Sequence, residues 1–207
     1  MAQHEGVMSA GSWQTGWFCL TVRDRLVDDG SHMTVDLPEL SITVQNFSGV
    51  LRGFWNVCAH RGTKMRSAGC GVGVLRCPYH GWVYNAQGIP TGIPDNDLLF
   101  RLDRAARKTL ALRPVDVECF GRFVFIRVTP GAETLTAALG DCAPFLAGMS
   151  GHDVEYREGR LEPAAKTQVG YRNLRLYGDG PVINGEITLP MGDQTPRVDW
   201  FTFVAAG

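Results

Sequence analysis

Cys58-Ala59-His60 and Cys77-Pro78-Tyr79-His80 are the two stretches that decide how this chain folds. The first has the spacing C-x-H and the second C-x-x-H, and 16 residues lie between them. At either spacing a thiol and an imidazole can converge from one loop, so two such loops present two sulfur and two nitrogen ligands. The pattern predicts a metal centre held between two loop tips.

Two kinds of metal centre use this set of ligands. Two Cys and two His bind a Rieske [2Fe–2S] cluster, in which two His replace two Cys on one of the two irons. Cys58 and Cys77 would then hold one iron, and His60 and His80 the other. Tetrahedral zinc also takes two Cys and two His, but the common zinc-finger order is Cys, Cys, His, His. The alternating order favours the cluster, with zinc as the alternative.

The residues around the two motifs predict short strands separated by turns. Both motifs would then lie at the tips of hairpin-like loops. Gly62 and Gly81 follow the motifs and would let backbone N–H groups approach the bridging sulfides of a cluster. Tyr79 and Trp82 are expected beside the metal centre. A helix interrupted by Pro144 is expected later in the chain. The strands are expected at 17–22, 41–45, 51–57, 72–76, 81–84, 115–128 (two strands), 169–177, 182–189 and 198–204, with a turn at 85–88 and the helix within 134–148.

The longer stretches Asn56–Gly62 and Leu75–Tyr84 resemble the N-terminal domain of the alpha subunit of the Rieske non-heme iron, or aromatic ring-hydroxylating, oxygenases. The resemblance extends from about Trp17 to about Pro130. It implies a mainly β fold: a Rieske-type antiparallel β-sandwich or barrel with a cluster-binding subdomain of two hairpin loops. It also implies one [2Fe–2S] cluster per chain, with the ligands Cys58, His60, Cys77 and His80.

The resemblance is to the oxygenase branch of Rieske proteins and not to the respiratory branch. Respiratory-type loops carry an extra Cys each, joined as a disulfide, and Thr63 and Tyr79 stand at the matching positions here. Trp82 stands where the respiratory type has a serine that donates to a sulfide. Fewer donors should lower the reduction potential, so we expect about −150 mV and not about +300 mV.

The resemblance also suggests a division of the chain. We expect a Rieske domain over 13–130, with cluster-binding loops at about 56–84, a linker with a short helix over 131–150, and a β-rich extension over 151–207. The extension is too short for a full oxygenase catalytic domain. It is either a remnant of one or an unrelated appendage.

Members of this family carry a second, mononuclear iron held by two His and one carboxylate. The chain has five His, of which His32 is expected in a Gly-Ser turn region, and only His152, beside Asp153, lies beyond the expected Rieske domain. We expect His152 to be a solvated loop residue, no catalytic residue, and no mononuclear iron on this chain. The oxygenase activity of ring-hydroxylating dioxygenase or monooxygenase alpha subunits therefore does not follow from the resemblance, whereas the electron-transfer role does.

Three functions are open on this evidence. The first is that of an electron-transfer protein, with a ferredoxin or flavin reductase as donor and an oxygenase subunit as one candidate acceptor. Alternatively it is a shortened oxygenase alpha subunit that hydroxylates an aromatic or other small organic substrate at an iron shared with another chain, with His80 as the contact. The third is a non-catalytic redox-sensing or zinc-stabilised interaction domain. A basic run is either a docking surface for an acidic donor or an ordinary solvated face: Arg101, Arg104, Arg107 and Lys108.

Composition and charge exclude several classes of protein and indicate the cellular compartment. The net charge of −1 over 207 residues gives no electrostatic case for nucleic acid, and no apolar run reaches membrane-spanning length. Met1–Gly11 lacks the basic start and apolar core of a signal peptide, so we expect a cytoplasmic protein. The other cysteines show no paired spacing, and two of them, Cys19 and Cys119, lie in apolar runs typical of buried free thiols.

Overall fold

The computed structural model describes residues 13–149, 154–159, 167–178, 182–191 and 194–205, and the chain forms two compact units. One unit comprises residues 25–117, and the other combines the described residues up to Asp24 with those from Glu118 onward. Antiparallel strands dominate both units, which confirms the mainly β class. No helix in the described ranges is long and apolar enough to cross a membrane.

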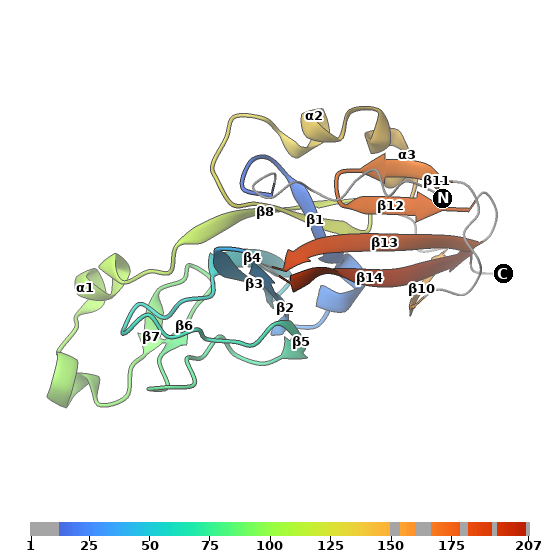
Figure 1. Ribbon diagram of the computed structural model, residues 1–207. Helices are drawn as coiled ribbons and strands as arrows, with labels where there is room; N and C mark the ends of the chain where they lie inside the picture. Colours follow the sequence, from blue (N-terminus) through green and yellow to red (C-terminus); the bar gives the residue numbers. More distant parts are fainter. Residues whose placement is uncertain (1–12, 150–153, 160–166, 179–181, 192–193, 206–207) are drawn as a thin grey trace. The chain divides into compact units, whose positions relative to one another are not determined.

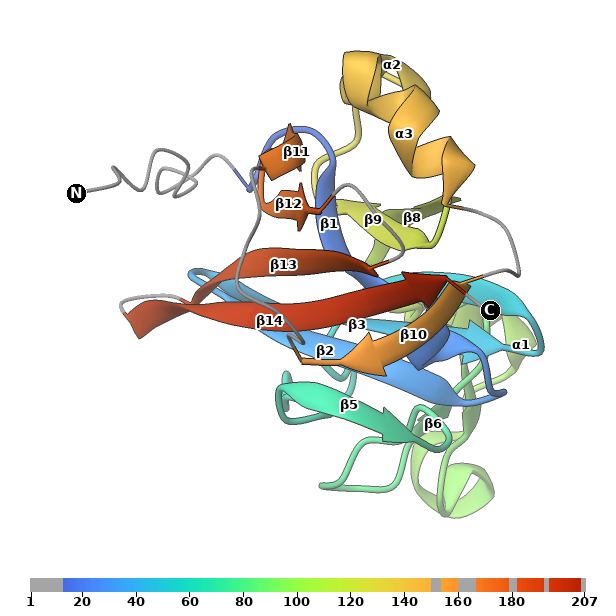
Figure 2. The ribbon, with the colours of Figure 1, turned by 90° about the vertical axis from the view of Figure 1, so that its right-hand side faces the viewer.

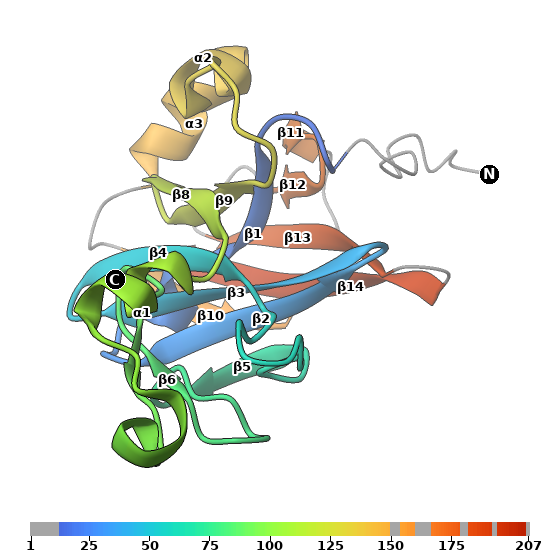
Figure 3. The ribbon, with the colours of Figure 1, turned by 90° about the vertical axis from the view of Figure 1, so that its left-hand side faces the viewer.

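The unit of residues 25–117 is built on an antiparallel sheet. Its strands are β2 (Ser31–Leu37), β3 (Leu40–Phe47), β4 (Val50–Trp55), β5 (Gly69–Val72) and the first half of β8 (Pro114–Phe120), in the order β8-β4-β3-β2-β5. Figure 3 shows β2, β3 and β4 side by side. A two-residue turn joins β3 to β4, with positive φ at Ser48 (51°) and Gly49 (91°). Such turns match the twist of paired strands and fix their register.

Gly53 allows β8 to pack closely against β4. A Cβ added there would lie 2.5 Å from a methyl carbon of Val115 and 2.6 Å from one of Val117. Real Cβ atoms do not approach a neighbour so closely, so this position requires glycine.

The part of this unit that carries the two motifs has little regular structure (Figure 1). It contains the two-stranded sheet of β6 (Val83–Tyr84) and β7 (Pro90–Gly92), a π-helical turn at Asn96–Phe100, and α1 (Arg104–Thr109). The expected turn at 85–88 is confirmed, because Asn85 Oδ1 accepts hydrogen bonds from the amides of Gln87 and Ile89. An aspartate caps α1 by accepting from the amide of Ala106.

Two expectations for this unit are wrong. The strand expected at 72–76 lies at Gly69–Val72 instead, because β5 pairs with β2 only as far as Val72 and then leaves the sheet at Gly73 (φ 152°). His32, which the sequence places in a Gly-Ser turn, lies inside β2 and pairs across to Gln45 and Gly71.

The second unit contains β1 (Phe18–Val22), which pairs with β9 (Phe123–Arg127), and the end of β8, which neighbours β9. It also contains a five-stranded sheet. In spatial order its strands are β10 (Val154–Glu158), β14 (Gln194–Ala205), β13 (Val182–Met191), β12 (Leu174–Tyr177) and β11 (Thr167–Tyr171). Figure 2 shows β10, β14 and β13 side by side. The ring of Phe123 packs against Phe201 and Phe203 of β14 at centroid distances of 5.8 and 6.0 Å.

The expected helix is present as two short helices, α2 (Leu135–Leu139) and α3 (Ala143–Gly148), with Pro144 in the first turn of α3. Proline is tolerated there because the amide it lacks would have no partner inside the helix.

Three details of this unit differ from expectation. The segment 169–177 is a hairpin and not one strand, because the chain reverses at Arg172 (φ 48°) and Asn173. Strand β10 is an addition that the sequence pattern misses. Cys119 is exposed on β8, whereas Cys19 is buried as expected. His152 and Asp153 lie outside the described residues.

Candidate metal centre

The first motif forms a tight loop. The amide of Cys58 donates to the carbonyl of Thr63 at 2.8 Å, and the amide of Gly62 donates back to the carbonyl of Cys58 at 3.0 Å. An isolated bridge between Val57 and Lys64 closes the base of the loop. Gly62 has φ 69°, a left-handed conformation that glycine adopts without strain.

The second motif repeats this backbone pattern. The amide of Cys77 donates to the carbonyl of Trp82 at 2.8 Å, and Gly81, with φ 71°, donates to the carbonyl of Cys77 at 3.0 Å. A bridge between Arg76 and Val83 closes its base. The two loops therefore present their cysteines in the same local conformation, as the hairpin-like loops of the sequence prediction require.

The two thiols lie together in an apolar environment. Cys58 and Cys77 are 2% and 1% exposed, and both belong to the same buried cluster. Burial is the main reason that the pKa of Cys58 is raised, and the neighbouring Cys77 adds to the effect. A thiol in such a place resists ionisation, but a bound cation reverses that preference and holds the thiolate. The packed apolar residues around them are Phe54, Met65, Leu75, Trp82, Tyr84, Ile93 and Leu112.

The two imidazoles form a second pair beside the thiols. The ring centroids of His60 and His80 are 4.6 Å apart, and both side chains are partly exposed. Burial, followed by the charges of His80 and Arg61, lowers the pKa of His60. Neutral imidazole is the form that binds a metal, so this environment favours the ligand state.

His60 is held in place by aromatic rings. Its ring stacks on Trp82, with centroids 4.8 Å apart and planes 4° apart, and meets Phe100 edge-on at 5.3 Å. Its Nδ1 atom is buried and has no hydrogen-bond partner among the residues that the structure describes. Leaving a buried polar atom without a partner costs free energy, and a metal bound to this nitrogen would remove that cost.

The structure pairs His60 with His80 and buries Cys58 and Cys77 in one apolar cluster, and this donor set fits a two-iron cluster. The ligands separate into a buried sulfur pair and a partly exposed nitrogen pair, which is the division that a Rieske cluster makes between its two irons. In the described part of the chain, no group of three or more His, Cys, Asp or Glu side chains surrounds a single ion position. A Rieske cluster does not need such a group, because each of its irons takes only two protein ligands.

The expected aromatic neighbours are confirmed, and two more were missed. Trp82 stacks on His60, and the 58%-exposed Tyr79 lies against His80 with ring centroids 3.8 Å apart. Sequence reasoning missed Phe100, and it missed Tyr84, whose hydroxyl lies 3.0 Å from the sulfur of Cys58. Neither contact has a signal in the spacing of the sequence, because each depends on segments that folding brings together.

The basic run is only partly free to bind a partner. Arg107 donates from Nε to the carbonyl of Leu102 at 3.1 Å and from a terminal nitrogen to the carbonyl of Thr91 at 3.0 Å, so it ties α1 to β7. Arg104 and Lys108 are exposed and line a cleft of about 790 Å³, together with Asp97 and Asp103 among others.

Comparison with known proteins identifies the domain. Residues 16–103 match the Rieske [2Fe-2S] domain family. The carnitine monooxygenase oxygenase subunit of Escherichia coli (strain K12) is 32% identical over 123 residues, which cover 58% of this chain and 32% of that protein. The large oxygenase component of the naphthalene 1,2-dioxygenase system of Ralstonia sp is 32% identical over 141 residues, covering 66% and 31%. The matched part is about a third of each of these curated relatives.

Solved structures share the fold over most of the chain. The quaternary ammonium Rieske monooxygenase CntA, in complex with an inhibitor, matches with a TM-score of 0.71 at 17% identity, covering 95% of this chain and 73% of that chain. Naphthalene 1,2-dioxygenase from Rhodococcus sp. bound to indole matches with a TM-score of 0.71 at 16% identity, covering 93% and 68%. The chain thus contains a Rieske [2Fe–2S] domain that is homologous to the oxygenase subunits of carnitine monooxygenase and naphthalene 1,2-dioxygenase.

Proposed function

We propose that the chain is an electron-transfer protein that accepts an electron from a ferredoxin or flavin reductase and passes it to an oxygenase site. A [2Fe–2S] cluster held by Cys58, His60, Cys77 and His80 would supply reversible one-electron chemistry. The observation that carries the proposal is the buried thiol pair beside a partly exposed imidazole pair. The sulfur side is kept from water while the nitrogen side stays within reach of a partner.

The surroundings of the imidazoles support this use. Trp82 and Phe100 exclude water from the inner face of His60, and Tyr79 covers one face of His80 while remaining exposed itself. A partner protein can therefore approach His80 and Tyr79 directly. Aromatic side chains at such a point offer apolar contact area and keep the two imidazoles in fixed orientations.

The electron donor, in this proposal, docks on the exposed basic side chains near α1. Arg101, Arg104 and Lys108 are exposed and suit an acidic surface, whereas Arg107 is occupied by backbone contacts. The proposed setting is the cytoplasm, where reducing conditions keep ligand thiols available for iron.

A second candidate function is that of an oxygenase subunit. It is favoured by the relatives, which are oxygenase subunits, and by the fold match over 95% of this chain, which extends beyond the matched Rieske residues 16–103. Residues 151–207 would then be part of an oxygenase catalytic domain, and residues 13–130 the Rieske domain. The substrate would be an aromatic or other small organic molecule, oxidised at an iron shared with another chain. We propose that this chain holds no mononuclear iron itself, because only one of its five His, His152, lies beyond residue 130, and a site with two His needs a second one there.

The test is anaerobic mixing of the iron- and sulfide-reconstituted chain with a reduced [2Fe–2S] ferredoxin in a stopped-flow spectrophotometer. Uptake of about one electron per chain, at a rate that falls with added salt, is the expected result. A reconstituted chain that takes an electron from dithionite but none from any ferredoxin or flavin reductase would refute the transfer role. Co-purification of the chain with an oxygenase subunit would favour the second candidate.

A further inference from the structure

We propose that Asn56 and Arg66 are positioning residues that hold the two ligand loops at a fixed separation before any metal binds. The inference rests on the proposed function, because its value to the protein is to present the four ligands together. The contacts of Asn56 and Arg66 are made to other protein atoms and not to a metal, so they can be tested in the metal-free and in the metal-loaded protein.

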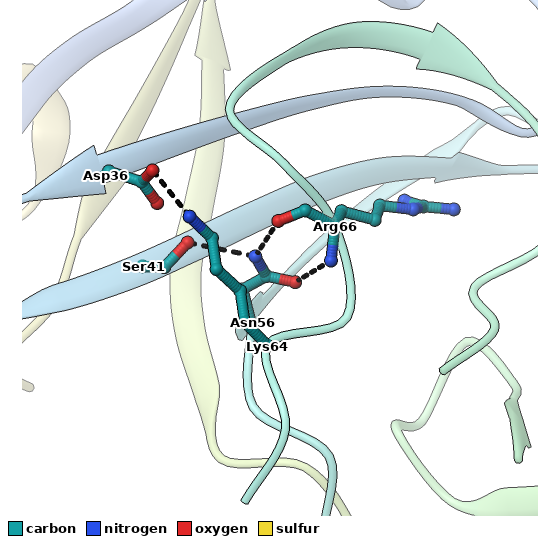
Figure 4. A network of polar contacts seen from close by, with 5 residues as sticks. All are labelled: Asp36, Ser41, Asn56, Lys64 and Arg66. Atoms are coloured by element: carbon teal, nitrogen blue, oxygen red, sulfur yellow. Dashed lines mark hydrogen bonds and ion pairs between the residues drawn. The ribbon is translucent and has the colours of Figure 1, made fainter. Parts of the chain in front are cut away.

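Asn56 fixes the return of the first loop. Its side chain is completely buried, and its amide makes a two-point contact with the backbone of Arg66: Oδ1 accepts from the Arg66 amide at 3.0 Å and Nδ2 donates to the Arg66 carbonyl at 2.7 Å. Nδ2 also donates to Ser41 Oγ at 2.9 Å. Figure 4 shows this amide between Ser41 and the backbone of Arg66. The two ends of the loop that carries Cys58 and His60 are thereby tied to each other and to β3.

Arg66 extends the same network to the second loop. From the position fixed by Asn56, one terminal nitrogen of its guanidinium donates to the carbonyls of Gly73 and Val74, both at 3.0 Å. The other reaches Thr43 Oγ1 on β3 at 3.4 Å. Gly73 and Val74 form the segment where the chain leaves β5, three residues before Cys77. These contacts hold the segment in place after it has left the sheet.

The contacts of Arg66 depend on its charge and shape. Burial lowers the pKa of Arg66 to about 10, so the guanidinium remains charged at neutral pH. Hydrogen bonds from a charged donor are stronger than neutral ones, and the planar fork of arginine serves several acceptors at fixed angles. A lysine reaches such a site with a single ammonium and cannot reproduce the fork.

The path from one ligand to the other is therefore short. Cys58 lies two residues beyond Asn56, the amide of Asn56 holds the backbone of Arg66, and the side chain of Arg66 holds Val74 ahead of Cys77. Ligands positioned in advance lose less conformational entropy when metal binds. Loss of this path should allow the second loop to move relative to the first.

Arg66→Met tests this directly, with Arg66→Lys as a conservative partner and Lys64→Met as the matched control. Lys64 lies on the same return segment and carries the same charge, but its ammonium contacts only the carboxylate of Asp36, at 2.5 Å, among the contacts described. Two properties of the full chain are measured: amide hydrogen exchange of the metal-free protein at Cys77 and Tyr84, and the rate at which a chelator removes iron from the loaded protein. The two amides close the second loop by donating to Trp82 and Leu75.

In Arg66→Met we expect exchange at these two amides to be about tenfold faster or more, because a charged donor with two carbonyl acceptors is lost. Iron loss should be about 10- to 100-fold faster, as for other contacts that orient metal ligands. Arg66→Lys should be intermediate, and Lys64→Met should match the wild type in both measurements.

Equal exchange and equal iron loss in Arg66→Met and Lys64→Met would overturn the inference. If Arg66→Met does not fold, Arg66→Lys decides: wild-type behaviour in both measurements contradicts the inference, and intermediate behaviour supports it. A wild-type chain that holds zinc without sulfide would refute the electron-transfer proposal, yet the exchange experiment on metal-free protein would still decide whether Arg66 holds the loops.

Discussion

The hydroxyl oxygen of Tyr84 lies 3.0 Å from the sulfur of Cys58 and 3.1 Å from the amide nitrogen of Ala59. The amide can only donate, so the oxygen accepts from Ala59; once Cys58 is the thiolate that binds iron, its sulfur can only accept, and the Tyr84 hydroxyl is then the donor to it. Burial, followed by the contact with Cys58, raises the pKa of Tyr84, so the hydroxyl keeps its proton. A residue that follows the second motif therefore donates to the sulfur of the first.

Tyr84→Phe should lower the reduction potential of the reconstituted protein. A donor to the ligand sulfur stabilises the extra negative charge of the reduced state, and its loss of roughly 1 kcal/mol corresponds to a shift on the order of 40 mV for one electron. A potentiometric titration followed by visible absorption measures the shift. Tyr79→Phe is the control, because its ring lies against His80 and not against a sulfur. Equal potentials for both variants would show that the Tyr84 contact does not tune the centre.

Cys77→Ser should abolish cluster assembly. The Cys77 side chain is 1% exposed beside Cys58, and a serine oxygen cannot supply the soft thiolate that iron–sulfur clusters use. Iron and acid-labile sulfide counts after reconstitution check this, with the exposed Cys70→Ser as the control that should retain both. Full iron and sulfide in Cys77→Ser would remove Cys77 from the proposed ligands.

The stability of the metal-free chain should fall in mildly acidic solution, partly because of His32. Burial, followed by the charge of Arg66, lowers the pKa of His32 below 6.5, so the unfolded chain takes up a proton at a higher pH than the folded chain. Stability from this residue is therefore complete above pH 6.5 and is lost as the pH falls from 6.5 through the lower folded value. Urea unfolding of wild type and His32→Gln from about pH 7.5 to about pH 5 measures the difference. Identical pH slopes for the two proteins would contradict the assignment.

Reversing the charge of Arg104 and Lys108 together to Glu should slow reduction by an acidic ferredoxin, by about tenfold or more at low salt and less at high salt. Both side chains are exposed on α1. Arg52→Glu with Arg157→Glu makes the same net change at exposed positions outside α1 and is the control. Stopped-flow rates across a salt series distinguish the two pairs, and equal slowing by both would indicate a general charge effect without a docking site at α1.

The sequence predicts the two loops well because their determinants are local. A Cys, a His and a glycine within five residues specify each loop tip, and the same backbone bonds recur at Cys58 and Cys77. The hairpin at Arg172 was missed because a non-glycine residue takes the left-handed conformation there, with no local signal. His32 was misplaced because Gly30-Ser31 reads as a turn, whereas pairing with a strand beyond it in sequence decides its conformation.

The contacts that complete the site could not be predicted from spacing. Tyr84 reaches Cys58 across 26 positions, and Arg66 reaches Val74 across eight, in each case because folding brings separate loops together. No single-sequence pattern carries that information, since the same residue types occur on many solvated surfaces. The metal ligands can be recognised from their local sequence, whereas the residues that orient them can be recognised only from the tertiary structure.

The most direct test of the central claim is electron paramagnetic resonance of the dithionite-reduced, anaerobically prepared chain, with iron, acid-labile sulfide and zinc counted in the same sample. A cluster held by Cys58, His60, Cys77 and His80 predicts a Rieske-type signal with about two irons and about two sulfides per chain. Zinc in place of iron, with no sulfide and no signal, would contradict it.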